Sequence, residues 1–386
     1  FFLLITMMMI ERINLKNSVI ITSSSMFLLL FQLLLLIVVV VDSTNIVISS
    51  LIEDRVFWTS HIDRSIDPLK SYDNEIDQWI DRLSESRFIQ IEYGCGRMQN
   101  RLLITDSGEK VCARYRRNNE QILGEYYSFL LARILQISNV IPTTLITFND
   151  NDDNNQSKVN FNRWKSVAKI LHDQARWETN KTIVLTKYLV DLKPTLIPLQ
   201  FRSKPKRLYP VPEDLNLTSN QQIHELVQWS DLIILDYLTG NTDRMINNMI
   251  NENWNPQMMD NPVHNLLQQN FNDHKLVFID NESGLFHGYR LLKRYEHLHR
   301  SLLDGLCVFR RQTILNLEKI STMKPNQFAK LLQNYFDRFA IEPIKNSSHL
   351  MPVKNFNILR QRIRQILKQV DICRQKFSLW SHHHSL

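Results

Sequence analysis

The most constraining feature of this sequence is a stretch of 24 residues that carries no charge. It runs from Ser18 to Val41, and from Met26 onward it consists of Leu, Ile, Val and Phe broken only by Gln32. At about 1.5 Å per residue, a helix of this length spans a hydrocarbon core of roughly 30 Å. Such a segment has to lie in a membrane or be removed, so we expect the part that folds in water to follow it.

The charges on either side of this stretch predict its orientation. Arg12 and Lys16 precede it, and Asp42 is the first charged residue after it. The positive-inside rule then predicts a short cytoplasmic tail over 1–17, a signal anchor over 18–41 and a lumenal remainder, which is a single-pass type II arrangement. A cleaved signal peptide is the alternative, because small residues follow the apolar run. Either topology places the rest of the chain in the secretory pathway.

The four cysteines fit an oxidising lumen. They are Cys95, Cys112, Cys307 and Cys373, an even set that allows three pairings. We favour Cys95 with Cys112, across an expected hairpin, and Cys307 with Cys373, which would tie down the C-terminal helix. Free buried cysteines are the alternative, and the spacing does not suggest zinc.

Composition excludes several classes of protein. Eight glycines in 386 residues, with 44% hydrophobic and 22% charged residues, indicate a folded globular chain rather than a collagen-like or low-complexity one. The net charge of +7 is compatible with nucleic acid, an anionic membrane surface or acidic substrates. No zinc-finger or RNA-recognition signature accompanies it, so we expect no nucleic-acid partner.

Hydrophobic periodicity and turn residues divide the lumenal part into elements. We expect a stalk over 42–85, a folded domain over 86–377 and a tail over 378–386. The expected elements of the domain are strands over 87–93, 101–105 and 110–115, a helix over 121–135, a strand over 183–189, an irregular segment over 192–212, a helix over 221–239 capped by Gly240, a loop over 241–248, a strand over 275–279 and helices from 296 onward.

This order, an antiparallel β-rich lobe followed by a mainly helical lobe, is that of a protein kinase, so we predict an α+β fold with two lobes. Asp243 and Asn248 are five residues apart, the spacing of a catalytic base and a metal-binding amide in a kinase catalytic loop. Asp280 directly follows the strand over 275–279, where it could hold a metal ion. Magnesium and manganese favour such oxygen ligands.

Denser motifs make the resemblance specific, and the match extends from about Val56 to Cys373. The motifs that carry it include Cys95-Gly96-Arg97, Val111-Cys112-Ala113-Arg114, Gly124-Glu125, Leu235-Asp236-Tyr237-Leu238, Asn241-Thr242-Asp243-Arg244, Phe278-Ile279-Asp280-Asn281-Glu282 and Cys307-Val308-Phe309-Arg310. Together they resemble the four-jointed box kinases, Golgi type II membrane proteins related to the secretory casein kinases.

The resemblance implies an activity and its cofactors. It implies transfer of the ATP γ-phosphoryl group, with Mn²⁺ or Mg²⁺, to Ser or Thr in the extracellular cadherin repeats of Fat and Dachsous. It also implies a role in planar cell polarity and growth control, and a Golgi membrane location from which the protein could be cleaved and secreted.

Carried over by position, the resemblance assigns roles to individual residues. Asp243 would orient and deprotonate the acceptor hydroxyl, Asp280 would hold the metal ion, and Asn248 would take a second one. Glu125 would pair with the cation of the neighbouring strand or face the metal.

Two features of the nucleotide site depart from ordinary kinases. Arg114 stands where they carry a lysine, so it must serve the phosphates, which changes the geometry. Gly94 and Gly96 are the candidates for a phosphate-covering hairpin, because no regular glycine-rich loop is present.

Asn-x-Ser/Thr sequons predict N-glycosylation at Asn155, Asn180, Asn216 and Asn346. A fifth sequon begins at Asn281, within the expected metal loop, where we do not expect a glycan.

Two other functions remain open. One is a catalytically weak kinase fold that acts as a binding or allosteric partner, which the arginine at position 114 favours. The other is a Golgi glycosyltransferase, which also needs manganese, although its compact acidic motif is not found after a strand.

Overall fold

The computed structural model describes residues 50–66, 69–149, 163–215, 219–269, 275–341 and 351–378, together with Gln32. Residues 1–50 and 51–386 form two separate units, and the fold below is that of the second. The expected anchor, apart from Gln32, and the sequons at Asn155, Asn216 and Asn346 lie outside the described residues. Within the described ranges, no helix has the length and apolar character needed to cross a membrane.

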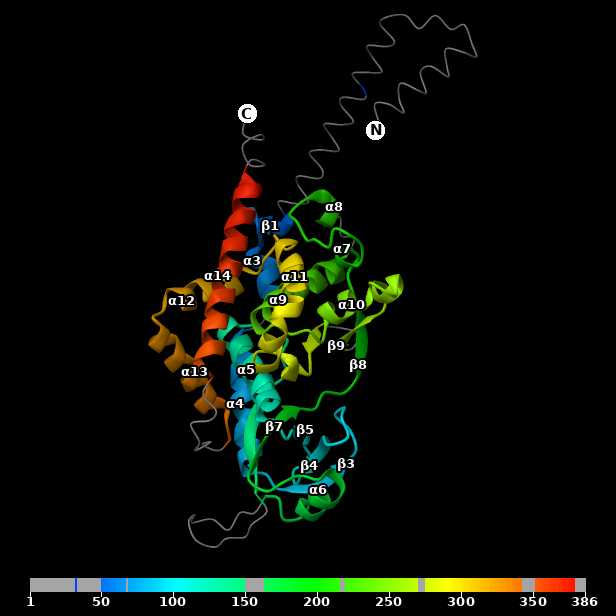
Figure 1. Cartoon of the computed structure of the whole chain (residues 1–386), viewed down its shortest axis with the longest axis vertical. Coiled ribbons are helices and arrows are strands. Elements are labelled where there is room, and N and C mark those ends of the chain that lie inside the picture. Colours follow the sequence, from blue (N-terminus) through cyan, green and yellow to red (C-terminus); the bar gives the residue numbers. More distant parts are fainter. Residues whose placement is uncertain are drawn as a thin grey trace, which may run out of the picture. The chain divides into compact units, whose positions relative to one another are not determined.

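The second unit contains a five-stranded antiparallel sheet (Figure 1). Its strand order is β3-β4-β5-β7-β6. The strands are β3 (Phe88–Glu92), β4 (Arg101–Thr105), β5 (Lys110–Arg114), β6 (Thr143–Phe148) and β7 (Lys181–Lys187). The expected strands over 87–93, 101–105 and 110–115 are confirmed as β3, β4 and β5, and β7 and β6 extend the sheet beyond β5. We call residues 88–187 the sheet lobe.

Helix α5 (Asn119–Leu135) connects the sheet to the rest of the molecule. Every side chain from Ile122 to Leu135 is buried, so this helix has no solvent face beyond its first turn. The Asn118 side chain caps its first turn by accepting a hydrogen bond from Glu120 N–H at 2.9 Å. The short helix α6 (Ala168–Ala175) covers the outer end of the sheet.

The helical lobe follows, with α9 at its centre. Helix α9 ends at Gly240, whose φ of 64° lets its N–H reach the carbonyls of the last turn, as predicted for a left-handed cap. The lobe contains α7 (Leu199–Arg202), α8 (Pro212–Leu215), α9 (Asn220–Thr239), α10 (Met245–Asn251), the 3₁₀ helix η1 (Pro256–Asp260), η2 (Asn281–Ser283), α11 (Phe286–Asp304), α12 (Arg311–Thr322), α13 (Pro325–Phe339) and α14 (Val353–Lys376).

A small three-stranded sheet lies between the two lobes. Its antiparallel strands are β8 (Leu192–Leu196), β9 (Pro262–Gln269) and β10 (Leu276–Phe278), in the order β10-β9-β8. Part of the expected irregular segment over 192–212 is therefore strand β8. The expected loop over 241–248 also differs, because its second half forms the start of α10.

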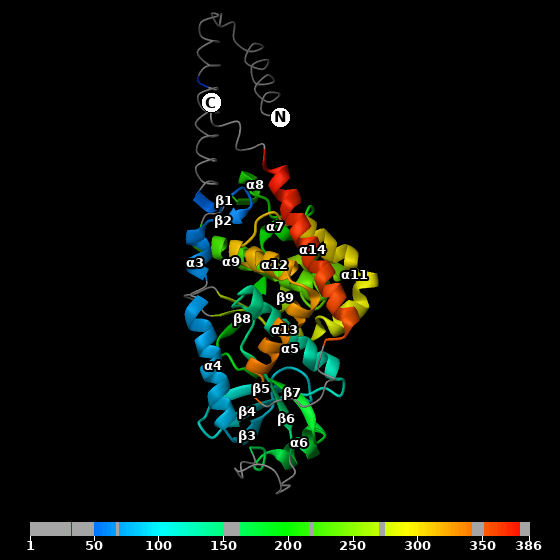
Figure 2. The same ribbon diagram turned by 90° about the vertical axis from the view of Figure 1, so that its left-hand side faces the viewer.

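The expected stalk does not hold for residues 51–85, which are part of the fold. They form β1 (Ile52–Glu53), β2 (Phe57–Trp58), α3 (Ser60–Ile66) and α4 (Leu69–Glu85). Trp58 and Trp79 have no exposed surface, and the Trp58 Nε1–H donates to Ser230 Oγ in α9 at 3.3 Å. Figure 2 shows α4 running along the side of the sheet lobe. The apolar face of α4 is buried in this arrangement, whereas a solvated stalk would leave it exposed to water.

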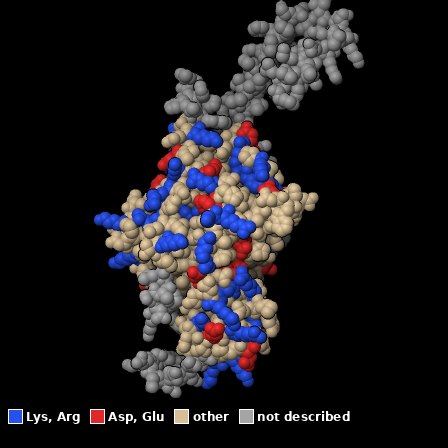
Figure 3. All heavy atoms as spheres, in the orientation of Figure 1, with Lys and Arg blue, Asp and Glu red and all other residues tan. Residues whose placement is uncertain are grey.

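Positive and negative side chains are interspersed on the face shown in Figure 3, where Lys and Arg do not gather into one stripe. Helix α14 buries an apolar face that includes Leu359, Ile363 and Val370. One charged residue of this helix is also buried. Arg362 is buried and donates to the Tyr237 carbonyl and the Glu296 carboxylate, so its charge is compensated inside the lobe.

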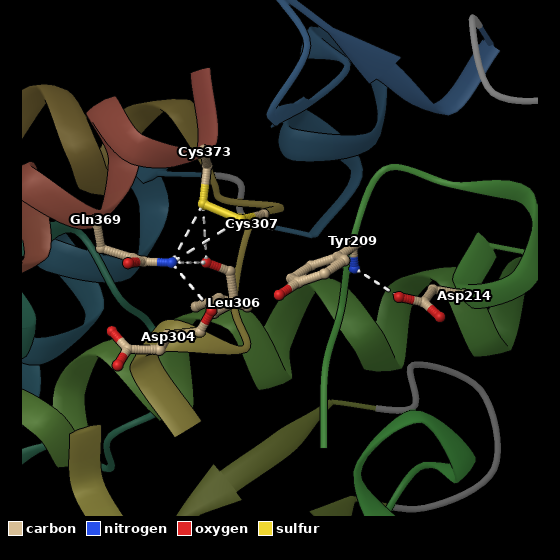
Figure 4. Close-up of a disulfide and its surroundings, with 7 residues drawn as sticks. All are labelled: Tyr209, Asp214, Asp304, Leu306, Cys307, Gln369 and Cys373. Atoms are coloured by element: carbon tan, nitrogen blue, oxygen red, sulfur yellow. Dashed lines mark hydrogen bonds between the residues drawn. A yellow bond between two sulfur atoms is a disulfide. The ribbon is translucent and has the colours of Figure 1, made fainter. Parts of the chain in front are cut away.

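Both predicted disulfides are present. Cys95 pairs with Cys112, and Cys307 pairs with Cys373, so no cysteine is free. Figure 4 shows the second bond, where the amide of Gln369 in α14 donates to the carbonyls of Asp304 and Leu306 at 3.1 and 3.3 Å. The covalent bond and these hydrogen bonds fix α14 to the chain after α11.

Candidate active site

A cavity of about 580 Å³ lies between the sheet lobe and the small sheet. One part of its wall is apolar and comprises Ile141, Leu189, Leu192, Leu267 and Ile279. Five other lining side chains are charged: Arg97, Arg114, Lys187, Asp243 and Asp280. A cavity lined by both apolar and charged side chains suits a ligand that has an apolar ring and an anionic group.

Arg114 is the last residue of β5, and its side chain lies across the cavity. It is 7% exposed, and its Nη1 donates to Asp280 Oδ1. Its Nε is buried without a hydrogen-bond partner among the described residues. Arg114 and Asp280 were predicted to act on the same ligand, and in this structure they are paired with each other.

Asp280 follows β10 in an unusual backbone conformation. Its φ of 55° places it in the left-handed region, which a non-glycine residue adopts at a cost. This conformation turns the chain from the strand into η2. It positions the carboxylate of Asp280 at the cavity and the side chain of Asn281 in the interior, where Asn281 is 2% exposed.

Glu125 lies behind this loop on α5 and is 1% exposed. Its Oε1 accepts a hydrogen bond from Asn281 Nδ2 at 3.2 Å, while its buried Oε2 has no hydrogen-bond partner among the described residues. Burial raises the pKa of Glu125, and the positive charge of Arg114 opposes that rise. An unpartnered buried carboxylate oxygen is a candidate ligand for a cation.

A divalent cation fits these residues. Within the part of the chain that the structure describes, no group of three or more His, Cys, Asp or Glu side chains is arranged to hold a metal ion. Asp280 and the unpartnered oxygen of Glu125 supply two hard oxygen donors, and substrate phosphates would have to supply others.

Asp243 is held in the cavity wall by neighbours on both sides. Its Oδ2 accepts hydrogen bonds from Asn265 Nδ2 at 3.3 Å and from Ser283 Oγ at 3.2 Å, and its own N–H donates to Asn241 Oδ1 at 2.9 Å. Ser283 belongs to the loop that begins with Asp280. The carboxylate of Asp243 is therefore hydrogen-bonded to the loop that carries Asp280.

Asn248 does not line the cavity. It is buried on α10, and its Nδ2 donates to the Met258 carbonyl in η1 at 2.9 Å. Its Oδ1 is buried without a hydrogen-bond partner among the described residues. Gly96 lines the cavity, whereas Gly94 lies beside it in the same turn.

Arg244 organises the site, although its role was not predicted. It has no exposed surface, and it donates to the Asp236 carboxylate, to Asn281 Oδ1 and to the Ile279 carbonyl. Burial raises the pKa of Asp236 to about 6, against the opposing effect of Arg244. The available signal was Asp236 itself, a charged residue in an otherwise apolar stretch of α9.

A second buried acid was also missed. Glu282 is 2% exposed, and its two oxygens lie 2.9 Å from Arg97 Nη2 and 2.6 Å from Arg116 Nη2. Burial raises its pKa, and the charge of Asp280 acts in the same direction.

Gly124 explains how α5 approaches this loop so closely. A Cβ at this position would lie 2.9 Å from the carbonyl oxygens of Glu282 and Gly284, closer than such atoms approach. Helix α5 and the loop over 280–284 are therefore in backbone contact.

Residues 74–376 match the model of the four-jointed box protein middle domain. The chain is 34% identical to the extracellular serine/threonine protein kinase four-jointed of Drosophila melanogaster, over 84% of this chain and 61% of that protein. It therefore spans less than two thirds of that relative. It is 30% identical to four-jointed box protein 1 of Homo sapiens, over 85% of this chain and 72% of that protein.

Among solved structures, the Golgi casein kinase aligns with 78% of this chain and 77% of its own, at 18% identity and a TM-score of 0.50. A hydra Fam20 structure with sugar aligns with 86% of this chain and 95% of its own, at 17% identity and a TM-score of 0.48. The likeness to the Golgi casein kinase shows the fold alone, and that fold is kinase-like.

Proposed function

This chain belongs to the four-jointed box family, and from that premise we propose that it is a secretory-pathway Ser/Thr protein kinase that uses ATP. The acceptors we propose are extracellular cadherin repeats of the Fat and Dachsous type, whose phosphorylation would regulate planar cell polarity and growth. We also propose the Golgi as its location, with residues 18–41 as the membrane anchor and the catalytic part in the lumen.

One observation carries this proposal: Asp243, Asp280 and Arg114, from three separate elements, line the same cavity. A kinase needs a base at the acceptor hydroxyl, an acidic metal ligand and a cation at the phosphates in one place. The hydrogen bonds from Ser283 and Asn265 fix the carboxylate of Asp243. The apolar wall around Leu192 and Leu267 suits the nucleotide base.

The side chains then have distinct tasks. The Asp243 carboxylate accepts a hydrogen bond from the acceptor Ser or Thr and takes its proton as the oxygen attacks the γ-phosphorus, while the bond from that phosphorus to the bridging oxygen breaks and ADP leaves. The guanidinium of Arg114 binds phosphate oxygens through its N–H groups. A bound Mg²⁺ or Mn²⁺, held by Asp280 and Glu125, would neutralise charge on the transferring phosphoryl group.

The test uses the chain from Leu51 onward, purified from a secretory expression system, with ATP, Mn²⁺ and a cadherin repeat. We expect Asp243→Asn and Asp280→Asn each to lower the rate of phosphate transfer at least about 100-fold, as loss of a catalytic base or metal ligand does. Asp173→Asn is the control, since Asp173 is exposed on α6.

Equal transfer by the wild type and both variants would refute the site assignment. Transfer of a sugar from a sugar nucleotide, without transfer from ATP, would refute the kinase assignment itself.

The contact between Arg114 and Asp280 favours a second candidate, a kinase fold that binds a partner and transfers phosphate poorly. In that case the pair would persist and compete with a metal ion for the Asp280 carboxylate. Wild-type protein that binds its cadherin partner but shows no Mn²⁺-dependent ATP binding in calorimetry would support this candidate.

A further inference from the structure

Arg97 is a charged residue of the cavity to which the proposed mechanism gives no task. It lies in the loop between β3 and β4 and lines the cavity together with Arg114 and Asp280. Its Nη2 lies 2.9 Å from Glu282 Oε1, yet its side chain is 57% exposed. Arg97 is therefore the accessible member of an otherwise buried ion-pair cluster.

The loop that carries Arg97 is fixed at several points. The disulfide from Cys95 to Cys112 bonds it to β5, two residues before Arg114. The buried Asn100 donates from Nδ2 to the Cys95 carbonyl at 2.6 Å, and its N–H donates to the Arg97 carbonyl at 2.9 Å. A short loop held in this way keeps the guanidinium at the mouth of the cavity without a flexible glycine-rich hairpin.

The partner of Arg97 does not depend on it. Glu282 is also paired with Arg116, whose Nη2 lies 2.6 Å from Glu282 Oε2. Arg116 is itself fixed, because its Nη1 donates to Asn100 Oδ1 at 2.7 Å and to the Tyr115 carbonyl at 2.6 Å. If Arg97 leaves Glu282, the buried carboxylate keeps one cation, so the large cost of an unpaired buried charge does not arise.

From this arrangement we infer that Arg97 is a phosphate-binding residue. Its guanidinium exchanges the Glu282 carboxylate for the phosphate oxygens of a nucleotide bound in the cavity, while Arg116 retains Glu282. Arg97 and Arg114 then contact the same anion from the loop and from the strand. This inference rests on the proposed function, because it assumes that the cavity holds a nucleoside triphosphate.

The experiment compares how variants bind ATP and adenosine in the presence of Mn²⁺, by titration calorimetry on the chain from Leu51 onward. We expect Arg97→Ala to weaken ATP binding about 10- to 100-fold, the effect of losing charge-assisted hydrogen bonds to phosphate. Adenosine has no phosphate, so its affinity should change less than about twofold. Arg97→Lys should recover part of the ATP affinity, because it restores the charge but not the planar fork.

Arg82→Ala is a matched control. Arg82 lies in the last turn of α4, its side chain is 55% exposed, and it pairs with an acid, Glu109, at 3.6 Å. It should bind ATP like the wild type.

Three results would overturn the inference, and they are distinguishable. Equal ATP affinity for Arg97→Ala and Arg82→Ala would show that Arg97 does not contact phosphate. Equal weakening of ATP and adenosine binding by Arg97→Ala would show that Arg97 only shapes the cavity. A wild-type protein that binds no ATP would refute the proposed function, and the inference with it.

Discussion

Arg244 illustrates the limit of prediction at the scale of single residues. Asp243, Asp280 and Arg114 could be selected from the sequence, because their spacing along the chain follows a kinase pattern. The roles of Arg244, Glu282 and Arg97 depend on partners that lie far along the chain, such as Asn281 for Arg244. Sequence spacing within one motif carries no information about such pairs, so these three roles had to come from the structure.

A buried histidine makes stability depend on pH. His299 in α11 is 2% exposed, and burial, reinforced by the charge of Arg362, lowers its pKa to about 3. In the unfolded chain this imidazole takes up a proton below about pH 6.5, whereas in the folded protein it stays neutral down to about pH 3. Its contribution to stability is therefore complete above pH 6.5 and is lost as the pH falls toward 3.

We expect this side chain alone to cost about 1.4 kcal/mol of stability per pH unit between pH 6 and pH 4. His299→Gln should flatten the acid side of the stability profile, measured by urea unfolding at a series of pH values. His61→Gln, which changes an exposed histidine of α3, serves as the control. Parallel profiles for the wild type and His299→Gln would contradict the assignment.

At the scale of elements, strong patterns were predicted well and weak ones were missed. Clear periodicity or clear end signals mark the strands β3, β4 and β5, the helices α5 and α9 and the Gly240 cap. Strand β9 was missed because it is rich in polar residues and lacks simple alternation. Asn265 was missed with it, although this residue of β9 donates a hydrogen bond to Asp243.

The backbone contact between α5 and the loop over 280–284 predicts that one added methyl group on α5 destabilises the fold. Gly124→Ala places a Cβ against the carbonyls of Glu282 and Gly284 and forces α5 and the loop apart. We expect a loss of about 1–3 kcal/mol in the free energy of unfolding, typical of overpacking. Phosphate transfer should fall further than stability explains, since Asp280 and Glu125 would separate.

Denaturant unfolding and transfer assays on the same preparations measure both effects. Gln121→Ala, a half-buried position on the same helix, should change neither by much. Normal transfer by a folded Gly124→Ala protein would show that the catalytic geometry tolerates a displacement of α5.

At the scale of the whole molecule, residues 51–85 are structural parts of the kinase-like unit. The Arg310 side chain connects α3 to α9, because it donates to Asp63 at 2.6 Å and to Asp231 at 2.7 Å. Asp231 has no exposed surface, and it also accepts a hydrogen bond from Thr313 Oγ1 in α12. These residues lie far apart in the sequence, so a domain boundary read from local composition fell too late.

Truncation tests this boundary. A chain that begins at residue 86 lacks Trp58, Trp79 and Leu83, which have no exposed surface in the fold. Each such side chain stabilises the folded state by about 1.5–3 kcal/mol, so we expect this chain not to fold. A chain that begins at Leu51 should unfold cooperatively on heating, as followed by circular dichroism. Cooperative unfolding of the shorter chain would restore the original boundary.

The placement of the disulfides has a consequence for how nucleotides enter and leave. The bond from Cys95 to Cys112 lies within the sheet lobe, and the bond from Cys307 to Cys373 lies within the helical lobe. Across the cavity, Arg97 and Arg114 contact Glu282 and Asp280 through ionic pairs. Each lobe is thus covalently reinforced, while the links between the lobes are ionic and can be broken and remade as a nucleotide enters and leaves.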